Sequence, residues 1–336
     1  MTGIPTGWYI IRGMLRSTLF CLSLLSLTAA AQYKPAFSAA ELKLPGKKGA
    51  CFTLREPRDK QDGSWEQNLP KLAKLKPSWN YSWGLDLVSQ QSRFVDSEFI
   101  PMTWSGRSVE HMEERLRQDL VPQIRRKKVK RLLAFNEPDG KKQANMSVEL
   151  ALSLWPTLEK LKIPLCSPSA VHPDREWMES FMEGAGNKGY RVDYIGVHHY
   201  GGTNAKHFKD KLKRAHEMYG GRLLLVTEFA CADWNTKGDF SKNGMSPGEV
   251  LAFAKEVLPW MEEQDWIAGY AWFSFEMHQP QGYTSALVHA DGSLTALGRY
   301  YASISPDNPK GDQGIEPDDP KEHLEAALKA AAAHKK

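Results

Sequence analysis

Two glutamates, Glu137 and Glu228, combine the residue type and the sequence setting that acid–base and nucleophilic chemistry require. Each follows a short apolar run, residues 132–135 in RLLAFNEPDG and residues 223–226 in RLLLVTEFA. Such runs are typical of strands in a parallel sheet that is covered on both faces. Pro138 has no backbone N–H to donate, so it ends the first strand and should leave Glu137 at the carboxyl end. Barrel enzymes keep their catalytic groups at that end.

A pair of carboxyl groups is what glycoside hydrolysis requires, because one protonates the departing oxygen while the other attacks the sugar or activates water. Asn136 precedes Glu137 and has an amide that can bind a sugar hydroxyl. Taken singly, either glutamate could be a surface or ion-paired group, and Glu276 could substitute for one of them. The two similar settings together favour a glycosidase site with Glu137 and Glu228 as the catalytic residues.

The elements that would position this pair follow one repeated pattern: an apolar run, then polar and aromatic residues, then a stretch with helical spacing. Eight strands alternating with helices predict a single-domain α/β fold, the (β/α)8 TIM barrel, in which the glutamates end the fourth and seventh strands. An open doubly wound sheet is the alternative, but no glycine-rich phosphate turn follows the first run. The eight runs begin at Gly49, Trp79, Glu98, Arg131, Ile163, Val192, Arg222 and Ile267.

The two ends of the chain differ from this central region. Arg12 and Arg16 flank the start of the apolar run STLFCLSLLSLTAAA, so residues 1–31 are predicted to be a secretory signal peptide that is cut before Gln32. An uncleaved anchor is the alternative, because an extra segment precedes the run. Residues 32–305 would then be the catalytic domain of a secreted or periplasmic protein. Residues 306–336 are rich in proline, charge and alanine, and are predicted to be a disordered tail with at most a frayed helix.

The composition argues against several other classes of function. The formal net charge is only +4, and the basic cluster RRKKVKR at residues 125–131 is interpreted as a solvated helix end and loop, so no nucleic-acid partner is expected. No segment after the signal peptide has the apolar length of a membrane span. Cys51, Cys166 and Cys231 lie in or just after apolar runs and are expected to be buried core residues, not zinc ligands. We expect a monomer without a cofactor.

Aromatic residues near the strand ends fit a sugar ligand, because sugar rings present apolar C–H faces that aromatic rings can cover. Each of them could instead belong to the core. The selected substrate-binding residues are Trp83, Trp104, Tyr200 and Trp272, and Trp79, Tyr81 and Trp234 are further aromatic residues that could lie near the mouth.

His198 and His199 should point to opposite sides of their strand, so only one of them is expected in the cleft. We select His199 as the substrate-binding residue, which would bind a hydroxyl or orient Glu228. A metal site formed by one of these histidines, Asp193 and Glu228 is the competing interpretation. No second histidine with ligand-like spacing follows a neighbouring strand, so we expect no metal.

These positions resemble a known family. FNEPDG, followed by QANMS and a predicted helix with Trp155, then HHYGG, VTEFA and GYAWFSF, is similar to the catalytic core of glycoside hydrolase family 128, a compact barrel family that includes endo-β-1,3-glucanases. The resemblance covers roughly residues 49–303. It implies that Glu137 is the general acid/base and Glu228 the nucleophile of a retaining, double-displacement mechanism.

The resemblance also implies that the substrate is a β-1,3-glucan polysaccharide or oligosaccharide and that the enzyme acts within the chain. A non-catalytic glucan-binding protein on the same barrel is the alternative, because a fold does not by itself imply activity. Transglycosylation through the same covalent intermediate stays open.

Overall fold

The computed structural model describes residues 35–55 and 64–335, so the predicted signal peptide lies outside the described residues. Residues 32–336 group as one unit. In the described part of the chain, no helix has both the length and the apolar character needed to cross a membrane.

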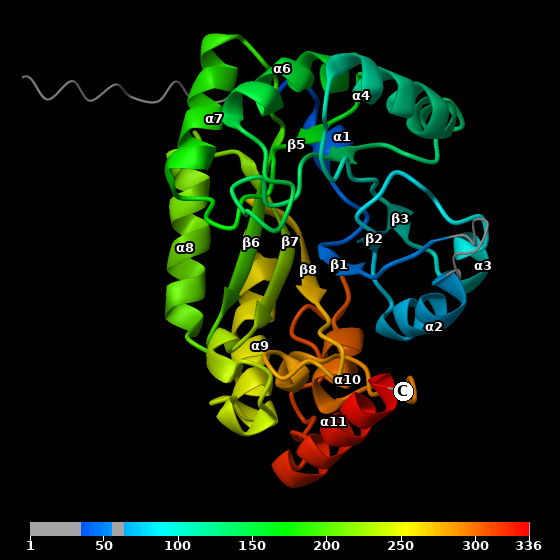
Figure 1. Ribbon diagram of the computed structural model, residues 1–336, viewed down its shortest axis with the longest axis vertical. Coiled ribbons are helices and arrows are strands. Elements are labelled where there is room, and N and C mark those ends of the chain that lie inside the picture. The colour runs from blue at the N-terminus through cyan, green and yellow to red at the C-terminus, as the bar shows by residue number, and fades with distance from the viewer. Residues whose placement is uncertain (1–34, 56–63, 336) are drawn as a thin grey trace, which may run out of the picture. The chain divides into compact units, whose positions relative to one another are not determined.

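Eight parallel strands form one sheet, in the order β3-β2-β1-β8-β7-β6-β5-β4 (Figure 1). The outer strands join through a parallel bridge between Met102 and Leu133, where the Thr103 N–H donates to the Leu133 carbonyl at 3.0 Å. The sheet therefore closes on itself, and the predicted (β/α)8 barrel is confirmed. The strands are β1 (Lys48–Cys51), β2 (Trp79–Tyr81), β3 (Glu98–Phe99), β4 (Leu132–Leu133), β5 (Leu165–Cys166), β6 (Tyr194–Gly201), β7 (Leu223–Cys231) and β8 (Ile267–Phe273).

Helices connect the strands and cover the outside of the barrel (Figure 1). The longest, α9, begins at a capping box in which Ser246 accepts from the Glu249 N–H at 3.2 Å and donates its own N–H to the Glu249 carboxylate at 2.8 Å. The helices are α1 (Ala39–Leu42), α2 (Trp65–Leu75), α3 (Gln91–Phe94), α4 (Val109–Arg115), α5 (Val121–Arg125), α6 (Val148–Glu159), α7 (Glu176–Asn187), α8 (Ala205–Met218), α9 (Pro247–Glu263), α10 (Ala296–Ser303) and α11 (Pro320–His334), with a π-helical turn, Leu116–Leu120, between α4 and α5.

Two apolar layers hold the barrel together. One lies inside the barrel and contains Trp79 and Tyr81, which are both fully buried, so this face of β2 points to the interior. The other, larger layer lies between the strands and the surrounding helices. Cys51 and Cys166 belong to the inner layer and Cys231 to the outer one, and all three are free and buried, as predicted.

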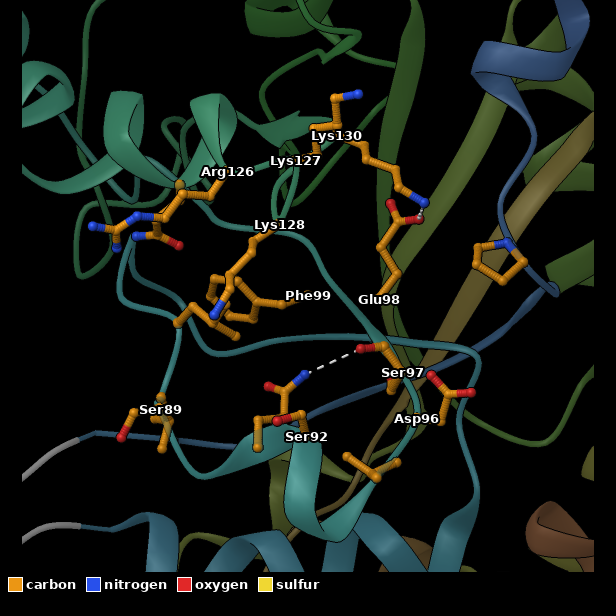
Figure 2. Close-up of a pocket in the computed structure, with 16 residues that line it drawn as sticks. Ser89, Ser92, Asp96, Ser97, Glu98, Phe99, Arg126, Lys127, Lys128 and Lys130 are labelled. Carbon is orange, nitrogen blue, oxygen red and sulfur yellow. Dashed lines mark hydrogen bonds and ion pairs between the residues drawn. The ribbon is translucent and has the colours of Figure 1, made fainter.

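The amino end of the barrel holds a cavity of about 560 Å³ between the β2–β3 connection and the residues that precede β4 (Figure 2). The exposed side chains of Lys127 and Lys128 lie at its edge, in the solvated helix end predicted after α5. Glu98, which also lines the cavity, forms an ion pair with Arg131 at 2.6 Å and a longer one with Lys130 at 3.7 Å. Arg131 and Glu98 are both buried, so this end of the barrel contains a buried ion pair.

The predicted disordered tail is wrong for residues 306–335, because these residues pack on the barrel and include α11. Asp319 caps this helix by accepting from the N–H groups of Lys321 at 2.9 Å and Glu322 at 3.0 Å. Alanine has the highest helix propensity, and small alanine side chains allow close approach of a helix to its neighbour. His323 and Ala327 are buried on one face and Leu324 packs against the same cluster, so the segment folds with few large apolar residues.

Candidate active site

A cavity of about 900 Å³ opens at the carboxyl end of the barrel. Its walls are built from residues that follow different strands, which is the arrangement that barrel enzymes use. The structure brings six of the eight predicted site residues together in this lining: Trp83, Trp104, Asn136, Glu137, Tyr200 and Glu228.

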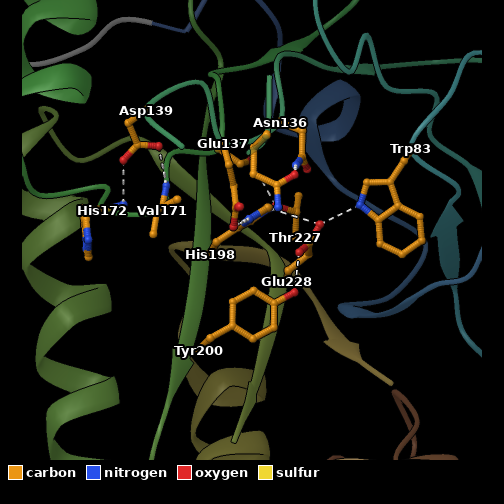
Figure 3. Close-up of polar contacts among 12 residues, drawn as sticks. Trp83, Asn136, Glu137, Asp139, Val171, His172, His198, Tyr200, Thr227 and Glu228 are labelled. Atoms are coloured by element: carbon orange, nitrogen blue, oxygen red, sulfur yellow. Dashed lines mark hydrogen bonds and ion pairs between the residues drawn. The ribbon is translucent and has the colours of Figure 1, made fainter. Parts of the chain in front are cut away.

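Glu228 lies in the carboxyl half of β7 and is held by three donors. Its Oε1 accepts from the Tyr81 hydroxyl at 2.9 Å and from the Trp83 indole N–H at 2.7 Å, and its Oε2 accepts from the Tyr200 hydroxyl (Figure 3). Burial, together with the nearby Glu228 carboxylate, raises the pKa of both phenols well above the usual value, so they stay protonated and donate. The three donors together fix the orientation of the Glu228 carboxyl group.

Glu137 follows β4 in an unusual backbone conformation, with φ of 42°. Positive φ is uncommon for a residue other than glycine and costs on the order of 1–3 kcal/mol, a strain that is concentrated at functional sites. Its N–H donates to the Ser169 carbonyl at 2.8 Å, and its carbonyl accepts from the Gly140 N–H at 2.9 Å. Asp139 accepts from the Val171 N–H at 2.9 Å, so the turn after β4 is fastened to the one after β5 (Figure 3).

His198 lies between the two glutamates (Figure 3). Its Nδ1 is 2.9 Å from Glu137 Oε1 and its Nε2 is 3.6 Å from Glu228 Oε1. Burial opposes the charged imidazole, but the Glu228 and Glu137 carboxylates outweigh burial and raise the pKa of His198. One proton-binding ring therefore links the two carboxyl groups.

Comparison with known proteins assigns this site to a family. The family model described as glycosyl hydrolase catalytic core matches residues 50–301. The chain belongs to this family. Among curated proteins, none matches this glycosidase.

Solved structures narrow the assignment. A family 128 subgroup I endo-β-1,3-glucanase from Amycolatopsis mediterranei, in complex with laminarihexaose, is 26% identical with a TM-score of 0.61, and the match covers 77% of this chain and 99% of that one. A subgroup III curdlan-specific exo-β-1,3-glucanase from Blastomyces gilchristii, in complex with glucose, is 26% identical with a TM-score of 0.57, covering 77% and 98% of the two chains. The predicted membership of glycoside hydrolase family 128 is confirmed.

The selection of His199 was wrong, because His198 shares the inward face of β6 with Tyr200, whereas His199 points outward. The pairing of β6 with β7 shifts register between Val197 and His198, which sets His198 opposite Glu228. The extra residue of this bulge is Thr227 on β7, so the bulge redirects Glu228 and leaves the alternation of β6 unchanged. His199 packs outside the barrel of the glycosidase, with its ring 5.1 Å from that of Phe208, and burial lowers the pKa of His199 to about 3.

Trp272 is also placed differently from the prediction. It is fully buried against Phe229, and its indole N–H donates to the Ser285 carbonyl at 2.9 Å. The next residue, Phe273, lines the cavity instead, with ring centroids 5.9 Å from Trp83 and 5.4 Å from Tyr200. The aromatic run on β8 does contribute to the cleft, but through the opposite face.

Connections and helices of the glycosidase supply further lining residues that the selection missed. Trp234, which follows β7, is one of these residues. Its side chain is 59% exposed at the rim of the cavity, and the sequence marks it only as one aromatic residue among several. These residues lie in irregular segments or on a helix, where no periodicity marks the side that faces the cleft. The additional lining residues are Thr53, Arg55, Gln143, Val171, His172, Lys211, Trp234, Phe273, Phe275, Gln279 and Gln281.

The possible metal ligands in the structure differ from the predicted set, because Glu137 takes the place of Asp193. Asp193 is buried at the amino end of β6, where it accepts from the Leu165 N–H at 2.8 Å, so it does not join Glu228. Glu137, His198 and Glu228 each offer one ligand atom, and these atoms lie within 4.8 Å of one another. Two carboxylates and an imidazole are ligands that suit zinc, so this set could hold an ion. In the described structure, Glu228 Oε1 already accepts two hydrogen bonds.

Proposed function

We propose that the protein is a secreted, retaining β-1,3-glucanase that acts within the glucan chain, with Glu228 as the nucleophile and Glu137 as the general acid/base. The observation that carries the mechanism is that one oxygen of Glu137 lies within 4.8 Å of one oxygen of Glu228. Retaining enzymes hold their carboxyl groups about 5–5.5 Å apart, whereas inverting enzymes need about 6.5–9.5 Å to admit a water molecule.

The hydrogen bonds support the division of roles. Glu228 accepts from three donors and is thereby oriented for attack. Glu137 has His198 as its side-chain partner, through Oε1. When His198 donates from Nδ1 to that oxygen, Glu137 can carry its proton on the other oxygen and offer it to the substrate.

The reaction then takes two steps. Glu137 gives its proton to the glycosidic oxygen while Glu228 attacks the anomeric carbon, which releases the leaving glucan and forms a glycosyl ester. Glu137, now a carboxylate, takes a proton from a water molecule, and the oxygen of that water attacks the anomeric carbon. Glu228 leaves as a carboxylate, and two inversions give net retention.

The substrate class follows from the lining and from the relatives. The aromatic rings of Trp83, Trp104 and Phe273 offer faces for sugar C–H groups. Related structures contain laminarihexaose, laminaripentaose or laminaritriose. The cavity of about 900 Å³ is at the upper end of the range for ligand sites, which favours several sugar units and cleavage within the chain.

Product analysis on a linear β-1,3-glucan tests the proposal. We expect oligosaccharides whose fresh reducing ends have the β configuration by NMR, before mutarotation mixes the two forms. Activity should persist after treatment with a chelator, which would argue against the metal set. Initial α products would indicate inversion, and the absence of products with intact binding would favour the glucan-binding alternative.

Export is part of the proposal and has its own test. Residues 1–31 have the composition of a signal peptide. Mass spectrometry of the protein from its native host should give a mature chain that begins at Gln32. Gel filtration of the same protein should give the size of a monomer. A chain that still begins at Met1 and is found in the membrane fraction would favour the uncleaved anchor.

A further inference from the structure

Residues 306–335, which we term the C-terminal segment, follow the matched catalytic core at residues 50–301 and yet pack beneath one wall of the cleft. That wall is formed by the β7–α9 connection, which carries Trp234, and the β8–α10 connection, which carries Phe275 and Gln281. The C-terminal segment itself supplies no lining residue among those described.

The two connections are fastened to each other. The Asp233 N–H donates to the Gln281 carbonyl at 2.8 Å, and the Asn243 side-chain amide donates to the Pro280 carbonyl at 2.9 Å. A movement of either connection would therefore displace the other, and with it the rings of the wall.

Helix α11 forms a small apolar core with both connections. Ala327 is fully buried against Met277, Tyr283 and Ala286 of the β8–α10 connection, and Phe240 of the β7–α9 connection packs against the same cluster. Buried His323 has its Nε2 3.0 Å from the Tyr283 carbonyl. A carbonyl oxygen can only accept, so Nε2 carries the hydrogen.

The other side of the C-terminal segment is anchored on the barrel. Lys255 of α9 donates to the carbonyls of Gln313 at 2.8 Å and Ile315 at 2.7 Å. Asp318 accepts from the Ala296 N–H at 2.9 Å, at the first residue of α10. The C-terminal segment thus connects two barrel helices with the two connections of the cleft wall.

We propose that the C-terminal segment is a brace that fixes the Trp234–Phe275 wall for binding of the outer sugar units of the substrate, with His323 and Ala327 as positioning residues. Trp234 is the exposed ring of this wall, and its centroid lies 5.9 Å from Tyr200 and 6.3 Å from Phe275. Irregular connections with few buried contacts open locally at low free energy, so a buried core beneath them holds the rings in place. The choice of a glucan as ligand rests on the proposed function.

Two alanines of α11 provide a matched test in the full-length protein. Ala327 is buried beneath the wall, whereas Ala332 on the same helix is exposed. In Ala327→Arg we expect faster amide hydrogen exchange over residues 232–246 and 274–286, and a KM for a six-unit β-1,3-glucan oligosaccharide that is raised about fivefold or more. The kcat on an aryl β-glycoside with two glucose units should stay within about twofold. Ala332→Arg should match the parent in all three measurements.

His323 provides a second pair if Ala327→Arg does not fold. His323→Ala removes the donor to the Tyr283 carbonyl and should raise the same KM, and His323→Gln should restore most of the binding because its amide can donate again. Equal hydrogen exchange and equal KM in Ala327→Arg and Ala332→Arg would overturn the brace. A similar fall in kcat on the six-unit oligosaccharide and on the aryl β-glycoside would also overturn it. If the parent cleaves no β-1,3-glucan, the proposed function fails, while hydrogen exchange still decides the brace.

Discussion

The two ends of the barrel hold cavities of different character. The cavity of about 560 Å³ at the amino end is edged by exposed lysines, and its buried acid, Glu98, is paired with buried Arg131. The cavity of about 900 Å³ at the carboxyl end holds two buried glutamates whose partners are phenols, an indole and a histidine.

The difference lies in the partners of the acids. Glu98 is paired with the full positive charge of Arg131, whereas Glu228 accepts from neutral donors that orient its carboxyl group for attack on a carbon atom. Chemistry at the carboxyl end and stability at the amino end is the usual division in this fold.

The largest effect is expected at the two glutamates. Glu228→Ala and Glu137→Ala should each lower kcat on β-1,3-glucan on the order of 10⁴-fold or more, because each removes a group that takes part in bond making or proton transfer. Azide with an activated aryl β-glucoside should distinguish the roles by NMR. It should give the α-glucosyl azide in Glu228→Ala, where it replaces the nucleophile, and the β-glucosyl azide in Glu137→Ala, where it attacks the intermediate.

Glu276→Ala is the control, because Glu276 was the rival acid and its half-exposed side chain is 3.7 Å from Lys71. It should retain activity within about twofold. If the two variants gave the opposite azide products, the roles of Glu137 and Glu228 would be exchanged. A large loss of kcat in Glu276→Ala would mean that a third acid takes part in catalysis.

A smaller effect is expected from the donors to Glu228. Tyr200→Phe removes one of its three hydrogen bonds, and a hydrogen bond to a charged group contributes about 1.5–3 kcal/mol. The value of kcat should therefore fall about 10–100-fold. Tyr300→Phe is the matched control, since that hydroxyl donates to the Lys310 carbonyl at 3.0 Å, away from the cleft. Equal kinetics of the two variants would remove Tyr200 from the active site.

The pH dependence of stability should have opposite signs at the two neighbouring histidines. The carboxylates raise the pKa of His198 in the folded state, so its contribution to the free energy of unfolding is fully present below the unfolded pKa of about 6.5 and is lost as pH rises through the folded pKa. Burial lowers the pKa of His199 to about 3, so His199 costs stability as pH falls below about 6.5.

Denaturant unfolding of His198→Gln and His199→Gln between pH 5 and pH 9 measures this contrast. Relative to the parent, His198→Gln should be most destabilised at the acid end of the range, and His199→Gln should gain stability there. Parallel curves for the two variants would contradict the placement of His198 between the carboxylates.

The barrel and the position of Glu137 and Glu228 at its carboxyl end could be predicted because their signals are local in the sequence. An apolar run followed by polar residues marks a buried strand and its end, and Pro138 adds to this signal after β4. The order of the runs then places Glu137 and Glu228 after or near the ends of strands four and seven, without any knowledge of the side-chain contacts.

The errors arise where a position depends on distant contacts. His198 lies on the inward face of β6 with Tyr200, and Phe273, not Trp272, lies on the inward face of β8. Alternation shows which residues share a face of a strand, but the packing of the whole barrel decides which face points inward. The packing of the C-terminal helix was not predicted, because alanine and histidine form a buried face only where another surface covers them.

The smallest effect on activity is expected at the amino end. Glu98→Gln leaves Arg131 buried without its carboxylate, and breaking a buried ion pair costs about 3–5 kcal/mol of the free energy of unfolding. Arg131 keeps hydrogen bonds to the Leu42 carbonyl at 3.1 Å and the Tyr194 hydroxyl at 2.8 Å, so the loss should be near the lower limit, about 3 kcal/mol.

The matched control is Glu113→Gln, which removes an ion pair with Lys160 whose side chains are 45% and 68% exposed and should cost less than about 1 kcal/mol. The value of kcat/KM at 25 °C should stay within about twofold of the parent in both variants, because neither acid lies at the cleft. A loss of kcat/KM in Glu98→Gln, measured where the variant is fully folded, would mean that the ion pair at the amino end also positions the catalytic end. The division between the two ends of the barrel would then fail.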